Sequence, residues 1–123
     1  MTDPASSIPV SAELACFDGR VAPSAETVIS VLDDGFIRGD GAFEVIRVYD
    51  GRPFALSDHL DRLGRSAANL RLGDGIPRKE LEREASELLS ARGGARFDGC
   101  LRVVLTRGGR LSLIHISEPT RPY

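Results

Sequence analysis

The sequence has 123 residues, 41% of them hydrophobic, and a formal net charge of −2 at pH 7. A chain of this length forms one domain or part of a larger protein, and its weak, mixed charge gives no reason to expect nucleic acid or an anionic membrane as a partner. No apolar run approaches the roughly 18 residues of a membrane span. Because residues 1–12 also lack the pattern of a signal peptide, we expect a cytoplasmic protein.

The N-terminal part of the chain predicts a lead-in followed by a hairpin. Residues 1–12 are rich in Ser, Pro and Ala and are predicted to be a flexible segment before a domain at 13–110. Residues 14–17 and 20–22 flank an Asp-Gly turn and are predicted to form the first hairpin. The β-prone run at 28–32 predicts a further short strand.

Residues 42–49 predict a longer strand with two different faces. Their alternation places Phe43, Val45 and Arg47 on one face and the residues Glu44, Ile46 and Val48 on the other. A second Asp-Gly turn then leads into residues 52–56, which complete a hairpin.

Two helices are predicted from apolar residues at helical spacing. The first has Ser57 or Asp58 as its N-cap, and its stripe is Leu60, Leu63, Ala67 and Leu70. The second runs from about Pro77 to Ala91, and its stripe is Leu81, Ala85, Leu88 and Leu89. A last strand is predicted over 100–106. This order of elements indicates an α+β fold, a sheet with the helices on one face.

Residues 111–123, LSLIHISEPTRPY, differ from the rest of the chain. They follow no turn, extend no pattern, and bring His, Ile and Pro into a chain rich in Arg, Ala and Gly. The string resembles a translated sequencing adapter, an artefact found at the ends of assembled reads. We therefore expect the native sequence to end near Arg110, and we assign no function to this tail, His115 included.

The two cysteines, Cys16 and Cys100, are isolated in the sequence. Neither belongs to a CxxC pair or lies beside a histidine at metal-ligand spacing. We therefore expect small buried hydrophobes or inert thiols, and no metal site.

Several polar residues are candidates for chemistry. The turn Gly39-Asp40-Gly41 is either a tight bend before a strand or a backbone shaped to hold a neighbour. Arg62, three residues after His59 on the first helix, is either a solvated arginine or an anion site, because a guanidinium matches phosphate with two hydrogen bonds. Arg47 and Arg102 lie in strands, either at a sheet edge or pointing into a polar cavity.

Together these motifs resemble a known family. The stretch DDGFIRGDGAFEVIRVYDGRPFALSDHLDRLGRSAANLRL is similar to the class IV pyridoxal-phosphate aminotransferases, which include branched-chain and D-amino-acid aminotransferases and aminodeoxychorismate lyase. The matching pattern is an acidic-Gly turn, an aromatic, G-D-G-x-F-E, a D-G-x-x-F hairpin, and H-x-x-R-L followed by S-A. The resemblance covers residues 14–110 and implies the small N-terminal domain of that fold, an antiparallel sheet with two helices packed on it.

The resemblance implies roles for individual residues. Arg62 looks like the arginine that binds the phosphate of pyridoxal phosphate, and Phe43 occupies an aromatic position that lines the substrate pocket. Arg47 matches a position near the substrate side chain or its distal carboxylate, and Arg102 matches an arginine beside the pocket. Asp40 is interpreted as structural.

Catalysis in this family needs a lysine that forms a Schiff base with the cofactor and then moves the proton. By resemblance, that lysine lies in a second domain beyond the chain given. Lys79 is the only lysine in the sequence and matches no catalytic position. The chain therefore looks like one domain of a two-domain enzyme, without a catalytic residue and inactive by itself.

For the whole protein, the resemblance implies a homodimeric aminotransferase that moves an amino group from an amino acid to a 2-oxo acid, branched-chain-like or D-amino-acid-like. One alternative is aminodeoxychorismate lyase, which eliminates pyruvate with the same cofactor. An alternative from another class is a non-catalytic chain, either a truncated domain that pairs with a full-length partner or an artefact of assembly. An isolated copy of the chain is expected to be poorly soluble or to associate with itself.

Overall fold

The computed structural model describes residues 13–17, 19–72, 76–107 and 112–117, the last range by its backbone. Within these ranges one sheet is formed by β1 (Leu14–Phe17), β2 (Arg20–Pro23), β3 (Gly41–Tyr49), β4 (Arg52–Pro53), β5 (Gly99–Thr106) and β6 (Ser112–Ser117). The helices are α1 (Asp34–Ile37), α2 (Leu56–Asn69) and α3 (Arg78–Ala91), with 3-10 turns η1 (Ser24–Glu26) and η2 (Gly94–Arg96).

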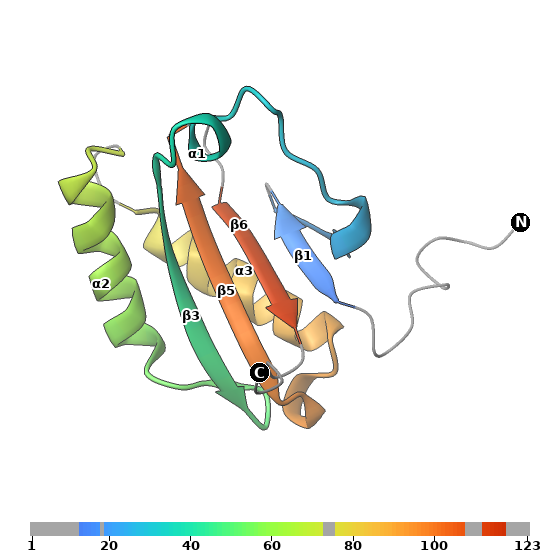
Figure 1. The fold of residues 1–123 in the computed structure, drawn as a ribbon. Coiled ribbons are helices and arrows are strands. Elements are labelled where there is room, and N and C mark those ends of the chain that lie inside the picture. Colours follow the sequence, from blue (N-terminus) through green and yellow to red (C-terminus); the bar gives the residue numbers. More distant parts are fainter. Residues whose placement is uncertain (1–12, 18, 73–75, 108–111, 118–123) are drawn as a thin grey trace, which may run out of the picture.

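The strands follow the order β2-β1-β6-β5-β3-β4, and neighbouring strands are antiparallel. In Figure 1, α3 lies behind β5 and β6, and α2 runs alongside β3. The predicted α+β class, the antiparallel sheet and the two packed helices are confirmed.

The burial pattern of β3 shows which face of the sheet the helices cover. Its buried residues are Ala42, Glu44, Ile46 and Val48. The apolar ones, Ala42, Ile46 and Val48, belong to one core with the apolar residues of α2 and α3, among them Leu60, Leu63, Ala67, Leu81, Ala85, Leu88 and Leu89. The alternate residues Phe43, Val45, Arg47 and Tyr49 lie on the opposite face, here called the open face, where Phe43 is 61% exposed. The faces predicted by alternation are therefore confirmed.

The start of α2 differs from the prediction. The helix begins at Leu56, so Ser57 and Asp58 lie inside its first turn and neither is the N-cap. That position belongs to Ala55, which has a left-handed backbone (φ 55°), and its carbonyl accepts a hydrogen bond from His59 N at 3.0 Å. The hairpin sets this start, because Phe54 N donates to Arg47 O at 2.7 Å and the chain must then turn sharply into the helix.

The strand predicted at 28–32 is wrong. These residues have no regular structure, and their apolar side chains are exposed. Regular structure resumes after Asp33, which is buried and accepts hydrogen bonds from Gly35 N at 2.7 Å and Thr106 Oγ1 at 3.2 Å. Asp33 thereby caps α1 and ties it to the end of β5.

A strand was not expected within residues 111–123, yet residues 112–117 form β6. This strand pairs with β1 on one side and with β5 on the other. Its Ile-rich, alternating sequence has a high β propensity. That propensity would complete a sheet whatever the origin of the segment, so its foreign origin stays a prediction. Residues 1–12 and 118–123 lie outside the described residues.

Candidate functional site

A buried carboxylate lies where α2 crosses β3. Glu44 is only 5% exposed and points from the strand toward the helix, which presents His59 and Arg62 to it. These two residues are three positions apart and therefore share one face of the helix. A glutamate at a buried position requires such partners, because an unpaired buried charge is strongly unfavourable.

The three side chains form one hydrogen-bonded cluster. Arg62 Nε donates to Glu44 Oε1 at 3.1 Å and to Oε2 at 3.0 Å, and Arg62 Nη2 donates to Oε1 at 2.7 Å. His59 Nδ1 lies 2.7 Å from Oε1, and because an ionised carboxylate only accepts, Nδ1 is the donor. The Arg62 hydrogen bonds lower the pKa of Glu44 against the opposing effect of burial, and the His59 bond lowers it further. Glu44 in turn raises the pKa of Arg62.

Beside this cluster is a hollow of about 260 Å³, lined by Asp58, His59, Arg62 and Arg65. The side chain of Arg62 is 61% exposed toward solvent even though Glu44 holds one of its edges. Among the described residues, Arg62 Nη1 has no hydrogen-bond partner. Two guanidinium groups beside an imidazole are a donor set that suits a phosphate group, and the two positive charges outnumber the single carboxylate of Asp58. The residues present therefore fit the anionic end of a phosphorylated cofactor.

The open face carries the residues that were predicted to line a substrate pocket. Arg102 Cζ lies 5.7 Å from the centroid of the Phe43 ring. Arg47 Nη1 donates to Gly99 O at 2.9 Å, and its Cζ lies 4.7 Å from the centroid of the Tyr49 ring. Arg102 is in an interior strand. Arg47 pairs with β5 on one side, but on its other side the short end strand β4 pairs only with Val48 and Tyr49.

The sequence-predicted residues thus fall on two sides of β3. Phe43 and Arg102 are brought together on the open face, with Arg47 on the same face. Arg62 lies with Glu44 on the helix side. Sequence reasoning missed Glu44 as a member of the site, although it had placed this charged residue on the same face as Ile46 and Val48. A single carboxylate on an otherwise apolar strand face is the sequence feature that could have identified Glu44.

Arg107 was also missed, and it explains the turn that precedes β3. Its Nε donates to Asp40 Oδ2 at 3.2 Å, and its other nitrogens donate to the carbonyls of Arg71, at 3.0 Å, and Leu70. One side chain therefore joins the Gly39-Asp40-Gly41 turn to the end of α2. These contacts favour the structural interpretation of Asp40.

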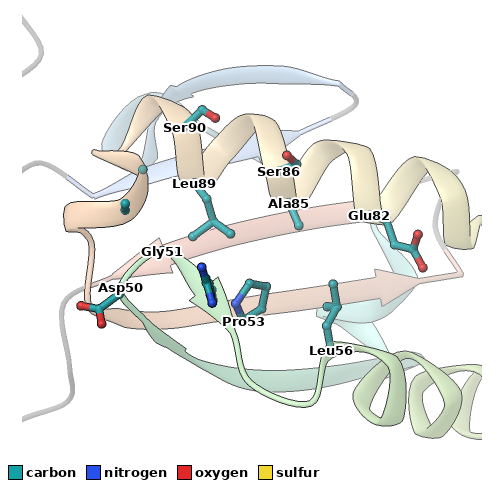
Figure 2. Close-up of a pocket in the computed structure, with 12 residues that line it drawn as sticks. Asp50, Gly51, Pro53, Leu56, Glu82, Ala85, Ser86, Leu89 and Ser90 are labelled. Atoms are coloured by element: carbon teal, nitrogen blue, oxygen red, sulfur yellow. The ribbon is translucent and has the colours of Figure 1, made fainter.

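A second hollow, of about 430 Å³, lies between α3 and the β3–β4 hairpin (Figure 2). Pro53, Leu56, Ala85 and Leu89 form its apolar floor, and Glu82 lies at one end. None of the predicted site residues lines it. Lys79 is exposed in the first turn of α3.

No group of three or more His, Cys, Asp or Glu side chains within the described ranges is placed to hold a metal ion. In the same part of the chain, no helix has the length and apolar character needed to cross a membrane.

The chain matches a known family over most of the described sheet and helices. The family model described as amino-transferase class IV matches residues 41–122. The chain belongs to this family.

Individual relatives are named for different activities. The chain is 37% identical over 92 residues to a D-alanine aminotransferase of Bacillus licheniformis, covering 75% of this chain and 32% of the relative. It is 37% identical over 91 residues to a putative branched-chain-amino-acid aminotransferase of Methanocaldococcus jannaschii, covering 74% and 31%. It is 35% identical over 72 residues to an aminodeoxychorismate lyase of Bacillus subtilis, covering 58% and 25%. The chain thus spans about a third of the length of the first two curated relatives.

A similar solved structure is that of a hypothetical aminotransferase from Mycobacterium tuberculosis in its pyridoxal-phosphate-bound form. It matches with a TM-score of 0.73 and 26% identity, over 86% of this chain and 40% of the other. The predicted small-domain fold of class IV aminotransferases is therefore confirmed.

Proposed function

We propose that the chain is the N-terminal domain of a pyridoxal-phosphate-dependent aminotransferase that moves an amino group between an amino acid and a 2-oxo acid. The observation that carries this proposal is Arg62. Glu44 holds it along one edge, while another nitrogen remains available beside a hollow that Arg62 shares with Arg65, His59 and Asp58. Membership of the family and the donor set of the hollow both support this assignment.

In this function the residues of the chain bind and orient. Arg62 would hold the cofactor phosphate, and Phe43 would border the substrate. Arg47 and Arg102 would supply positive charge for a substrate carboxylate from the open face. The chemistry supplied by the bound cofactor is temporary storage of the amino group and of the electron pair released at the substrate carbon. We place the catalytic lysine outside this chain, because Lys79 is exposed at the start of α3 and matches no catalytic position.

The substrate class is a branched-chain amino acid or a D-amino acid. Relatives named for each of these substrates share 37% identity with the chain. Phe43 together with Arg47 and Arg102 favours the branched-chain side. The relative named aminodeoxychorismate lyase supports a second candidate, elimination of pyruvate with the same cofactor and fold.

The test begins with source DNA amplified across the codon of Arg110. A reading frame that continues into a second domain with a lysine would allow the whole protein to be purified with pyridoxal phosphate. We then expect the visible absorbance of the bound cofactor to change on addition of L-leucine or D-alanine, with the amino group recovered on an added 2-oxo acid. Pyruvate released from aminodeoxychorismate would favour the lyase, and a frame that ends at Tyr123 would favour the non-catalytic domain.

We further propose that the whole protein is a cytoplasmic homodimer, and that the chain by itself associates because the open face exposes Phe43, Val45 and Tyr49. Light scattering coupled to size exclusion is expected to give a mass above 13.3 kDa for the 123-residue chain. A monodisperse monomer at high concentration would contradict self-association.

A further inference from the structure

We propose that Glu44 is a positioning residue, whose carboxylate fixes the guanidinium of Arg62 so that a second edge of the group faces an incoming phosphate. This inference rests on the proposed role of Arg62. The evidence is the cluster that connects β3 to α2, in which a nearly buried carboxylate holds a largely exposed arginine.

Glu44 occupies one edge of the Arg62 guanidinium and leaves a second edge free. The hydrogen bonds to Glu44 come from Nε and Nη2. A guanidinium is planar, with five N–H donors, so a group held along its Nε–Nη2 edge still presents its Nη1–Nη2 edge. That second edge can meet two phosphate oxygens in the fork-to-fork manner. Arg62 therefore has the donors to bind the carboxylate and a phosphate at once.

Glu44 has two opposite effects on phosphate binding: it favours binding by holding Arg62 in one orientation and disfavours it by its negative charge. An exposed arginine that moves freely must be ordered when an anion binds, and a fixed one has already been ordered on folding. The negative charge of Glu44, however, weakens the attraction of the site for an anion. His59 contributes to the fixed state, because its bond to Oε1 holds the carboxylate that holds Arg62. If Glu44 acts by positioning, its removal weakens phosphate binding even though the site becomes more positive.

The experiment uses the complete 123-residue chain, labelled with ¹⁵N, and follows the Nε–H signals of arginine side chains by NMR. The probes are inorganic phosphate and pyridoxine 5′-phosphate, which has no aldehyde and cannot react with Lys79. Ionic strength is held constant with chloride. The variants are Glu44→Gln, which keeps the shape of the side chain, Arg62→Ala, and Asp58→Asn as the matched control.

We expect Glu44→Gln to raise the Kd for both probes roughly three- to tenfold, because the amide cannot accept the paired bonds that hold Arg62. Asp58 lines the same hollow without a hydrogen bond to Arg62 among the described residues, so Asp58→Asn removes a negative charge from the site without releasing Arg62 and should lower the Kd slightly. Arg62→Ala should abolish binding.

The outcomes separate the two proposals. If Arg62→Ala abolishes binding but Glu44→Gln binds as tightly as the wild type or more tightly, the positioning role of Glu44 is overturned and the role of Arg62 stands. An equal loss in Asp58→Asn also overturns the positioning role. If the wild-type Arg62 signal does not respond to the probes, or Arg62→Ala leaves binding intact, the phosphate assignment itself fails.

A measurement on the wild type covers the case in which Glu44→Gln does not fold. The ¹⁵N heteronuclear NOE of Arg62 Nε is expected to be close to that of the helix backbone, and that of exposed Arg65 to be much lower. An Arg62 Nε as mobile as that of Arg65 would overturn the inference without any substitution.

Discussion

Arg62 in α2 holds both carboxylate oxygens of Glu44 in β3, and this contact joins helix to sheet across a buried position. Glu44 is nearly inaccessible to water, so its charge depends on Arg62 and His59 for compensation. The contact therefore contributes to the docking of α2 as well as to the candidate site.

Acid is expected to lower the free energy of unfolding because it protonates Glu44. Its pKa lies below the ordinary 4.5, chiefly because of the Arg62 hydrogen bonds. A group whose pKa is lowered by folding stabilises the protein fully above its unfolded pKa, and that contribution is lost as the pH falls through the folded pKa. We expect the free energy of unfolding to fall more steeply below pH 4.5 in the wild type than in Glu44→Gln. Urea denaturation at a series of pH values would test this, and parallel curves would contradict it.

Gly51 is expected to be far less tolerant of substitution than Gly39. Both have positive φ, 74° and 70°, so alanine should cost about 1–2 kcal/mol at either position from backbone strain. At Gly51 a Cβ would also overlap the carbonyl of Gly94, whereas a Cβ at Gly39 would meet no described atom within 4 Å beyond its own chain neighbours. We expect Gly51→Ala to lose about 3 kcal/mol or more in total. Urea denaturation of both variants measures the difference, and equal losses would show that the η2 backbone moves aside.

Leu63 is expected to be one of the main contacts between α2 and the sheet. It is fully buried in the core, and truncation to alanine should lower the free energy of unfolding by about 2–5 kcal/mol. Leu70, near the end of the same helix, is 38% exposed, so Leu70→Ala should cost less than about 1 kcal/mol. A similar midpoint shift for both variants in thermal unfolding would refute this ranking.

The two thiols should differ sharply in reactivity. Burial raises the pKa of Cys16 to about 11, with a smaller effect from the charges of Glu84 and Glu87. Because the thiolate is the nucleophile, Cys16 should resist iodoacetamide at neutral pH, and the half-buried Cys100 should react first. Peptide mass spectrometry after a short exposure, with an unfolded sample as control, measures the order. If Cys16 and Cys100 are labelled at the same rate, β1 must open readily.

Features that depend on side-chain periodicity could be predicted from the sequence. The stripe through Leu60, Leu63 and Ala67 and the two faces of β3 follow from spacing alone. Leu70, predicted as part of the same stripe, instead follows the last residue of α2 and is 38% exposed. The strand expected at 28–32 was wrong because β propensity is local, whereas a strand also needs a partner beside it. The left-handed Ala55 was likewise invisible, since the preceding hairpin imposes it.

The candidate site likewise has features that the sequence predicts and features that it does not. The position of Arg62 on a helix and of Phe43 on a sheet face could be predicted. The contact between Arg62 and Glu44 joins residues 18 positions apart in different elements, and Arg107 reaches Asp40 from 67 positions away. Such pairs exist only after the helix has packed on the sheet, so no local pattern predicts them.

The place of β6 has a consequence for assembly. In the described sheet β1 and β5 do not pair with each other, and β6 alone fills the space between them. Both walls of that space are rows of backbone N–H and C=O groups, which recognise an extended segment with little regard to its side chains. A native continuation, a foreign tail or the matching strand of another copy would therefore meet the same two rows of backbone groups at this position.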